Sequence, residues 1–370
     1  MEDLLKYQIG ITLIKGIGPN LAKNLIAYLG SVEAVFKEKK QHLAKIPGIG
    51  EVLSNEIASQ DVLHRAEKEI EFIQKNKIQT HFFTSKSYPF RLKECPDSPI
   101  MLYYKGNRNL NEGKFIGIVG TRKATEYGKD ICKQMVSDFS KKLPDITIVS
   151  GLAYGIDVCA HKASCSSNLP TIGVLGHGLD RIYPGMHRST AVKMLKNGGL
   201  LTEFMSETNP DRPNFVQRNR IIAGMCDALI VVESGKKGGA LITADLANDY
   251  NRDVFAVPGR TNDGFSAGCN MLIKYNKASL AESADDIIRL MNWEVSDVKT
   301  REIQASLFEE LTENDKEIIS ILRKNADGVN VNELAILLNK PYSKLSSKLL
   351  EMEFKGLVKC LPGGMYKVVK

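Results

Sequence analysis

The chain has 370 residues, 43% of them hydrophobic and 25% charged, which is typical of globular proteins and long enough for two or three domains. No run of apolar residues reaches the roughly 18 needed to span a membrane, and the acidic N-terminus lacks the layout of a signal peptide, so a cytoplasmic protein without membrane contact is expected. The net charge of +7 is compatible with a polyanionic partner but does not identify one.

An internal near-repeat occupies the first 75 residues. One copy is LIKGIGPNLAKNLIAYLG (13–30) and the other is LAKIPGIGEVLSNEIAS (43–59). Each copy places Gly-Ile-Gly between two short helical patterns. This arrangement resembles the helix-hairpin-helix motif, in which the glycines let the backbone approach a phosphate. Residues 1–75 are therefore predicted to form a helix-hairpin-helix (SAM-like) helical domain, which either contacts DNA or serves only as a scaffold.

A second domain is predicted over residues 80–291. Residues 80–106 begin and end with strand-like runs, and beyond residue 114 short apolar runs alternate with helical stretches, which is typical of an α/β fold with a parallel sheet covered by helices on both faces. Four of the runs end in glycine or Ser-Gly, and ligands gather at the carboxyl ends of parallel strands, so these loops mark one functional edge. The runs are FIGIVG, ITIVSG, TIGVLG, LLTEF, ALIVVES and DVFAVPG.

The C-terminal part is predicted to be a linker, residues 292–311, followed by a winged-helix domain, residues 312–370. Three helical patterns precede two short strands that flank the turn LPGG. In this order Pro-Gly-Gly supplies the turn of the wing, and Ser343 to Lys348 begin the helix that reads DNA in related folds. A winged helix used for protein contacts is the alternative.

In the stretch IGIVGTRKATEYG (116–128), an apolar run typical of a buried strand leads into a loop suited to bind an anion. It does not match the dinucleotide-binding fingerprint, because its glycines are spaced differently and the third is missing, and the chain contains no GxxxxGK[ST] sequence. Arg122 stands at the mouth of the loop, where its guanidinium group can fork to two phosphate oxygens.

Five loops at the same sheet edge are predicted to supply backbone N–H groups and cations, with few acids. The decisive one is DRPNFVQRNR, in which arginines alternate with an aromatic ring and which offers no matching carboxylate. A groove for single-stranded nucleic acid needs this pattern, because arginines follow phosphates and a ring stacks on a base, worth roughly 1–3 kcal/mol per base. The loops are 150–164, 176–185, 209–224, 233–247 with Lys237, and 266–278 with Lys274.

The sequence gives only weak support for any catalytic residue. Asp157 and His161, at i and i+4, could hold a metal or relay a proton, but such a pair more often braces a helix; His177 is expected to make a loop hydrogen bond or a DNA contact. Asp180 and Glu203 have no identifiable partner, and no nucleophile set can be assembled. The seven cysteines contain no CxxC pair, so neither a zinc site nor a disulfide framework is predicted. No metal or cofactor is expected.

The motifs resemble one known family. VGTR, SGLAYGIDVCAH, GHGLDRIYP, TEF, FVQRNRIIAG, GGALITADLA, DVFAVPG and GCNMLI, in this order over about residues 80–290, are similar to the DNA processing protein A family (DprA, or Smf). The resemblance implies an extended Rossmann-like domain that forms a homodimer and binds single-stranded DNA without sequence preference. It also implies a recombination mediator that protects single strands and loads a RecA-type recombinase during natural transformation, and it implies no catalysis.

The same resemblance assigns roles by motif position. It implies that Arg122 and Arg212 hold phosphates, that Phe215 stacks a base, and that Arg218 and Arg220 line the same groove. The complete set of predicted DNA-binding residues is Gly120, Thr121, Arg122, Ser150, Gly151, Arg212, Phe215, Arg218, Asn219, Arg220, Lys237 and Lys274.

Two other hypotheses remain open. One is a nucleoside-monophosphate phosphoribohydrolase of the lysine-decarboxylase-like class, whose PGGxGTxxE loop carries a catalytic glutamate. Here the corresponding GKKGGALITADLA has Thr243 and Asp245 but no glutamate at that spacing. The other is a scaffold whose basic loops bind protein partners.

Overall fold

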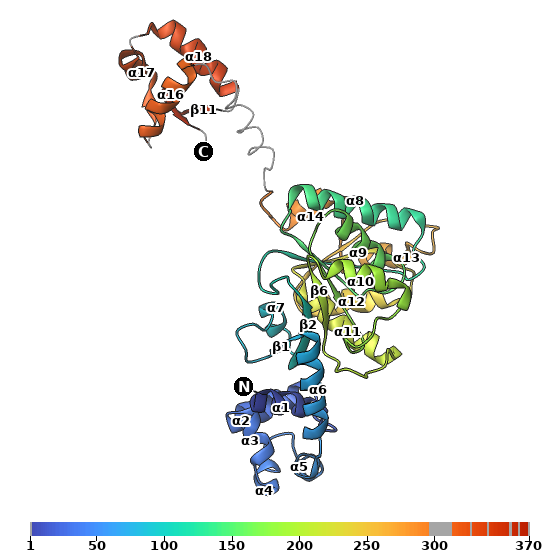
Figure 1. Ribbon diagram of the computed structural model, residues 1–370. Helices are drawn as coiled ribbons and strands as arrows, with labels where there is room; N and C mark the ends of the chain where they lie inside the picture. The colour runs from blue at the N-terminus through green and yellow to red at the C-terminus, as the bar shows by residue number, and fades with distance from the viewer. Residues whose placement is uncertain are drawn as a thin grey trace. The chain divides into compact units, whose positions relative to one another are not determined.

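The structure, a computed structural model, divides the chain into two compact units, Met1–Ser296 and Asp297–Lys370 (Figure 1). Most of the predicted linker lies outside the residues that it describes. The fold class is confirmed: a mixed α/β sheet domain, with a helix-hairpin-helix region before it and a winged helix after it. The described residues are 2–295, 313–325, 328–338, 340–354, 357–361 and 363–368.

The N-terminal helices contain the predicted repeat as two hairpins that pack against each other. Gly16 and Gly48 have φ values of +80° and +86°, which only glycine adopts at little cost. A Cβ atom at Gly16 would lie 2.8 Å from Leu53 Cδ2, and one at Gly48 would lie 3.1 Å from Leu21 Cδ2. Each turn therefore contacts the corresponding leucine of the other copy. The helices are α1 (Glu2–Gly10), η1 (Ile11–Leu13), α2 (Pro19–Leu29), α3 (Val32–Lys37), α4 (Lys40–Leu43), α5 (Glu51–Ser59) and α6 (Leu63–Asn76).

A nine-stranded sheet follows, in the order β1-β2-β6-β5-β4-β3-β7-β8-β9. The strands from β6 to β9 in this order are parallel, and β2 pairs antiparallel with both β1 and β6. All six predicted runs are strands. The strands are β1 (Gln79–Phe82), β2 (Met101–Gly106), β3 (Phe115–Gly120), β4 (Thr147–Ser150), β5 (Thr171–Val174), β6 (Gly199–Thr202), β7 (Ala228–Glu233), β8 (Asp253–Ala256) and β9 (Ser279–Leu280).

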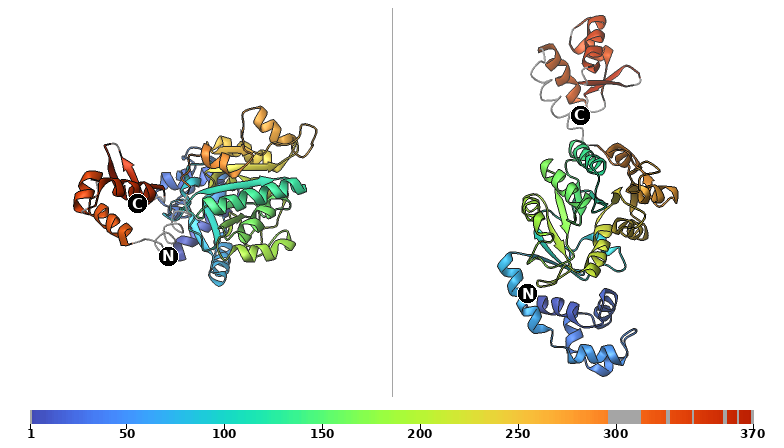
Figure 2. Two further views of the ribbon diagram at one scale, coloured as in Figure 1. Left: turned by 90° about the horizontal axis from the view of Figure 1, so that it is seen from above. Right: turned by 90° about the vertical axis from the view of Figure 1, so that its right-hand side faces the viewer.

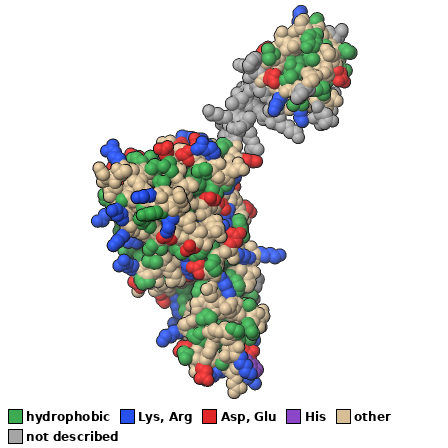
Figure 3. Space-filling view, turned by 180° about the vertical axis from the view of Figure 1, so that it is seen from behind, with side chains coloured by type: hydrophobic (Ala, Val, Ile, Leu, Met, Phe, Trp, Pro, Cys, Tyr) green, Lys and Arg blue, Asp and Glu red, His purple; other side chains and the backbone are tan. Residues whose placement is uncertain are grey.

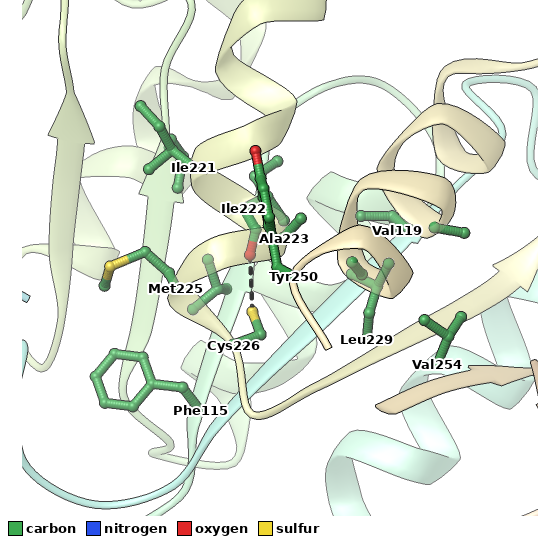
Figure 4. Packing of buried hydrophobic residues seen from close by; sticks show 14 of the residues in the cluster. Phe115, Val119, Ile221, Ile222, Ala223, Met225, Cys226, Leu229, Tyr250 and Val254 are labelled. Carbon is green, nitrogen blue, oxygen red and sulfur yellow. Dashed lines mark hydrogen bonds between the residues drawn. The ribbon is translucent and has the colours of Figure 1, made fainter. Parts of the chain in front are cut away.

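Alternate residues of the strands enter two separate cores, one on each face of the sheet. Helices cover both faces (Figure 2). In β3, Phe115 and Val119 face one core while Ile116 and Ile118 face the other, as the period of two along a strand requires. Figure 4 shows Phe115 and Val119 in one buried cluster with residues of α11, among them Ile222 and Met225. The first core is covered by α7 (Phe90–Lys93), α11 (Arg212–Met225), α12 (Gly239–Asp249) and α13 (Ala267–Lys274), and the second by α8 (Glu126–Lys142), α9 (Ile156–Ser166) and α14 (Ala284–Leu290). Beside α9 lie η2 (Gly185–His187) and α10 (Arg188–Met194).

Helix α6 fastens the helical region to the sheet. Glu69 is 1% exposed, and its side chain accepts hydrogen bonds from the backbone N–H (2.9 Å) and the hydroxyl of Ser206. Arg65 donates to the Ser206 carbonyl oxygen at 2.7 Å. Because Ser206 lies between β6 and α11, these contacts hold the segment that leads into α11.

The second unit has the winged-helix order that the sequence predicted. Its three-stranded sheet has the order β10-β12-β11, and Gly363 and Gly364, with φ of +85° and +68°, form the turn of the wing. In α18, Lys348 is bridged to Asp315 at 3.0 Å and to Glu351 at 3.1 Å, so part of its charge is neutralised. The elements are α16 (Glu313–Lys324), β10 (Val329–Asn330), α17 (Val331–Leu337), α18 (Tyr342–Phe354), β11 (Val358–Leu361) and β12 (Met365–Val368).

Candidate nucleic-acid interface

The candidate site lies at the carboxyl edge of the parallel strands, beside the point where the strand order reverses. β3 is paired with β4 on one side and with β7 on the other, so the helices that follow β3 and β7 leave toward opposite faces. At such a switch point open α/β sheets typically bind ligands in a crevice between the two loops. Lysine and arginine side chains project along one flank of the larger unit in Figure 3.

The loop that carries Arg122 is held by a buried carboxylate. Glu233, which is 1% exposed, accepts hydrogen bonds from the N–H and hydroxyl of Thr125 at 2.8 and 2.6 Å. A Cβ at Gly155 would lie 2.1 Å from the Thr121 carbonyl oxygen, so only glycine lets the next loop approach this one. Arg122 itself is exposed. The loop is therefore rigid at its base and cationic at its tip.

The prediction that residues 209–224 form a loop is wrong. Residues from Arg212 onward form helix α11, with Pro213 in its first turn, where proline is well tolerated. Helical spacing places Arg212, Phe215 and Asn219 near one face, whereas Arg220 points elsewhere. The cations and the aromatic ring that alternate in the sequence are therefore divided between two sides of the helix.

Phe215 is the centre of a cluster of aromatic and cationic side chains. Its ring stacks on Tyr183, with centroids 5.7 Å apart and planes at 30°. The guanidinium carbons of Arg122 and Arg218 lie 5.8 and 5.9 Å from the Phe215 centroid, within cation–π range. A Cβ at Gly176 would lie 2.8 Å from Phe215 Cδ1, so the glycine makes room for the ring. Tyr183 is 46% exposed and offers the more accessible ring.

Tyr183 was not among the predicted site residues. The sequence signal was an aromatic residue in the glycine-rich loop GHGLDRIYPG. Its stacking on Phe215 joins residues 32 positions apart in the sequence, and no local pattern indicates such a contact.

Arg218 is buried and ties α11 to the strand ends. It is 3% exposed, and its Nη1 donates to the carbonyl oxygens of Gly151, at 2.7 Å, and Val174. Burial lowers the pKa of Arg218 to about 10, opposed by the nearby Asp157 carboxylate. Its charge acts on the site from below the surface, rather than through open contact with a ligand.

Arg220 lies in a buried ion pair on the other side of α11. Its guanidinium group donates to Glu203 and to the Asp97 carbonyl oxygen, and both side chains of the Arg220–Glu203 pair are 9% exposed. Burial raises the pKa of Glu203, while Arg220 opposes the shift. Two sequence interpretations are therefore wrong: this stretch has a matching carboxylate, and Glu203 has a partner.

The remaining predicted residues fall into three groups. Gly120 and Ser150 are structural: a Cβ at Gly120 would lie 2.5 Å from Ile156 Cγ1, and the buried Ser150 hydroxyl donates to the Ile118 carbonyl oxygen at 2.6 Å. Lys237 is exposed just before α12, beside the crevice. Lys274 is the last residue of α13. It lies about 9 Å along the helix from Gly268, whose N–H donates to the Ser234 carbonyl oxygen.

Asp157 and two buried histidines, His161 and His177, make structural hydrogen bonds. The sequence favoured such a role over catalysis. Asp157 Oδ2 accepts from the Gly151 N–H at 3.2 Å, and His161 Nδ1 lies 2.7 Å from Thr171 Oγ1. Burial lowers the pKa of His161 to about 3. His177 Nδ1 bonds the Gly178 carbonyl oxygen at 2.9 Å. Within the described residues, no group of three or more His, Cys, Asp or Glu side chains could hold a metal ion, and no helix is long and apolar enough to cross a membrane.

The fold and the site define a class: a Rossmann-like sheet domain with a cationic and aromatic strand-end edge, flanked by helix-hairpin-helix and winged-helix modules. Residues 79–292 match the family model described as DNA recombination-mediator protein A. The chain belongs to this family, the DprA or Smf family that its motifs predicted. Residues 9–60 match the SAM-like helix-hairpin-helix tandem, and residues 305–364 match the DprA winged helix domain.

Individual relatives and solved structures that resemble this chain belong to the same family. The chain is 30% identical to protein Smf of Synechocystis over 98% of both chains. It is 43% identical to DNA processing protein DprA of Bacillus subtilis, over 57% of this chain and 70% of that protein. The X-ray structure of DprA from Streptococcus pneumoniae superposes with a TM-score of 0.66 at 30% identity, covering 77% of this chain and 97% of that one.

A second solved structure concerns the binding of single-stranded DNA. It is the Helicobacter pylori DNA processing protein A, described for its single-stranded DNA binding mode. It has a TM-score of 0.52 and 27% identity to this chain, and the match covers 58% of this chain and 95% of that one.

Proposed function

We propose that this protein binds single-stranded DNA without sequence preference and acts as a recombination mediator that loads a RecA-type recombinase. One observation carries the DNA-binding part: Arg122 converges on the stacked rings of Phe215 and Tyr183 at the open edge of the sheet. The reported single-strand binding of the Helicobacter pylori relative supports it.

The arrangement favours single strands over duplexes. A base can stack on an aromatic ring only when it is free of its complement, and each such contact is worth roughly 1–3 kcal/mol. In the proposed complex a base stacks on the exposed face of the Tyr183–Phe215 pair, while Arg122 and Arg212 hold the flanking phosphates. Gly151 and Asn219 shape the same groove, and Lys237 extends it along the crevice.

The first prediction concerns the centre of this cluster. Arg122→Ala combined with Phe215→Ala should weaken binding of a fluorescent oligothymidylate by about 100-fold in anisotropy titrations, because one phosphate contact and one ring are lost. The variant should also show a shallower dependence of affinity on salt concentration.

The matched control is Lys141→Ala with Phe90→Ala. It removes a cation and an exposed aromatic residue from α8 and α7, away from the crevice, and should leave affinity unchanged. Equal affinity of the site variant and this control, with both folded by circular dichroism, would contradict the proposed function.

The second prediction assigns Tyr183 a direct role. Tyr183→Ala should lose roughly 5- to 100-fold in affinity for oligothymidylate, whereas Tyr183→Trp should retain binding, with its fluorescence quenched by the bound base. An oligonucleotide of abasic sites should bind wild type and Tyr183→Ala equally. A Tyr183→Ala variant that keeps full preference for bases over abasic sites would remove Tyr183 from the site.

The mediator role and the homodimer are tested separately. The protein should increase nucleation of a RecA-type recombinase on strands already covered by single-strand-binding protein, and the Arg122→Ala, Phe215→Ala variant should not. Light scattering should give about twice the 41.0 kDa chain mass. If the protein bound single strands but had no effect on recombinase nucleation, it would be a DNA-binding protein and not a recombination mediator.

We propose that the site is not catalytic. In the segment that corresponds to the phosphoribohydrolase motif, Thr243 and Asp245 lie in α12. Thr243 donates to the Gly239 carbonyl oxygen at 3.0 Å, and Asp245 is paired with Lys277 at 2.8 Å. Both side chains are engaged in helix and surface contacts. Release of free base from nucleoside monophosphates by the purified protein would favour the enzyme instead.

A further inference from the structure

A cavity of about 550 Å³ lies between α9 and α10, beside the amino ends of β5 and β6. The candidate site lies at the carboxyl ends of the parallel strands, so the cavity is at the opposite edge of the sheet. Its volume falls within the range of sites for small organic molecules. The cavity is therefore separate from the candidate site and large enough for a ligand of its own.

Three lysines line this cavity: Lys162 of α9, Lys193 of α10, and Lys196, which follows α10. Among the described residues, none of the three forms an ion pair or donates a side-chain hydrogen bond, whereas every lysine of the neighbouring helix α8 is paired with an acid. Only Lys193 lies in the last turn of its helix, where the helix dipole favours a cation. The cavity is therefore left positive.

Acidic residues are scarce around these lysines. In the part of the chain that the structure describes, no carboxylate lines the cavity. Asp180 is the only acidic residue between Asp157 and Glu203 in the sequence. It is paired with Arg181 at 2.8 Å in the loop after β5, at the other edge of the sheet. The charge that balances the three lysines therefore comes from solution.

Uncharged side chains complete the lining. Thr190 is 4% exposed and lines the cavity, yet its hydroxyl makes no hydrogen bond with any described residue. Ser166 and Ser189 add two further hydroxyls to the lining, and the buried Leu169 and Met194 form an apolar wall. The cavity thus joins an apolar wall to hydroxyl donors and cations. This combination suits a molecule with an organic part and several anionic oxygens.

We propose that this cavity binds a small organic phosphate of nucleotide size. Its phosphate groups lie against the three lysines and accept a hydrogen bond from Thr190, while its organic part packs on Leu169 and Met194. Three cations match a di- or triphosphate better than a monophosphate, so affinity rises with the number of phosphates. An enclosed shape favours a compact ligand over an extended strand. This inference does not rest on the proposed function.

The test titrates magnesium-free ATP calorimetrically into the full chain carrying Arg122→Ala and Phe215→Ala, in which the candidate site does not contribute. One ATP should bind per chain. Affinity should fall from ATP through ADP to AMP, and adenosine should not bind. Inorganic tripolyphosphate should bind at least about tenfold more weakly than ATP, because it leaves the apolar wall unused. In wild-type protein, saturating oligothymidylate should not displace the ATP from this cavity.

Substitutions at exposed positions make the assignment specific. Lys193→Ala with Lys196→Ala should weaken ATP binding by about 10- to 100-fold, because two charge-assisted contacts are lost. Ser189→Glu, which places a carboxylate in the cavity, should abolish it. The matched control, Lys133→Ala with Lys141→Ala, removes the same charge from α8 and should leave ATP binding unchanged.

Four outcomes would overturn the proposal. The first is no binding of ATP at millimolar concentration, and the second is binding of adenosine as tight as that of ATP. The third is equal weakening by the two lysine double variants, which would indicate unspecific attraction to a basic protein. The fourth is displacement of ATP by oligothymidylate, which would make the cavity part of a DNA path.

Discussion

At the scale of single residues, Arg218 and Arg220 show how position on a helix decides the role of a charge. Both were predicted to line the DNA groove. Arg218 donates to the carbonyl oxygens at the ends of β4 and β5, whereas Arg220 is locked to Glu203 on the other side of α11. The sequence could not separate them, because only the helical conformation assigns residues two positions apart to different sides.

The Arg220–Glu203 pair leads to the third prediction. Glu203→Ala leaves the guanidinium group of Arg220 buried without its carboxylate, which typically costs about 3–5 kcal/mol. We expect a fall of that size in the free energy of unfolding, measured with urea. The salt dependence of DNA binding should be unchanged. Glu207→Ala, at a side chain that is 82% exposed, is the control and should change stability little; equal stability of the two variants would contradict the buried-pair interpretation.

At the scale of elements, the strands were predictable and α11 was not. The six strands carry uninterrupted apolar runs because the parallel sheet is covered on both faces, and this signal survives in the sequence. Arg218 and Arg220 are both buried residues of α11, so charged residues occupy positions where apolar residues would reveal a helix. The candidate site was predicted by motif at Arg122 and Phe215, while the stacking of Tyr183 required the fold.

The hairpin repeat gives the fourth prediction. Gly16→Ala places a Cβ 2.8 Å from Leu53 Cδ2 at a φ of +80°, so it should destabilise the helical region by at least about 1–2 kcal/mol. Adding Leu53→Ala should relieve the clash but not the backbone strain. The two changes should therefore couple favourably in a double-mutant cycle.

The control for this cycle is Gly18→Ala. Gly18 belongs to the same turn, but its φ is −83° and no atom lies within 4 Å of the added Cβ. Its stability should change by less than about 0.5 kcal/mol. Additive effects of Gly16→Ala and Leu53→Ala would show that the two hairpins do not press on each other at this point.

At the scale of the whole molecule, the helical region is a structural part of the larger unit. One core joins Ile9, Leu25 and Ile57 of the helices to Met101 and Tyr103 of β2. The contacts of Glu69 with Ser206 extend this junction toward the candidate site, because the same segment continues into α11. The repeat in the sequence indicated a helical domain but gave no sign of this junction, since Glu69 reads as a surface charge on an amphipathic helix.

Removing the Glu69 carboxylate tests this connection. Glu69→Ala leaves the Ser206 N–H without its acceptor and removes the carboxylate that is paired with Arg65 at 2.9 Å, so the free energy of unfolding should fall by about 1–3 kcal/mol. Amide hydrogen exchange should accelerate at residues 204–211, which precede α11, and stay unchanged in β4 and β5. Glu71→Ala, at an exposed position on the same helix, should alter neither quantity. If exchange at 204–211 is the same in both variants, the segment is held by the sheet alone, and α6 does not position the candidate site.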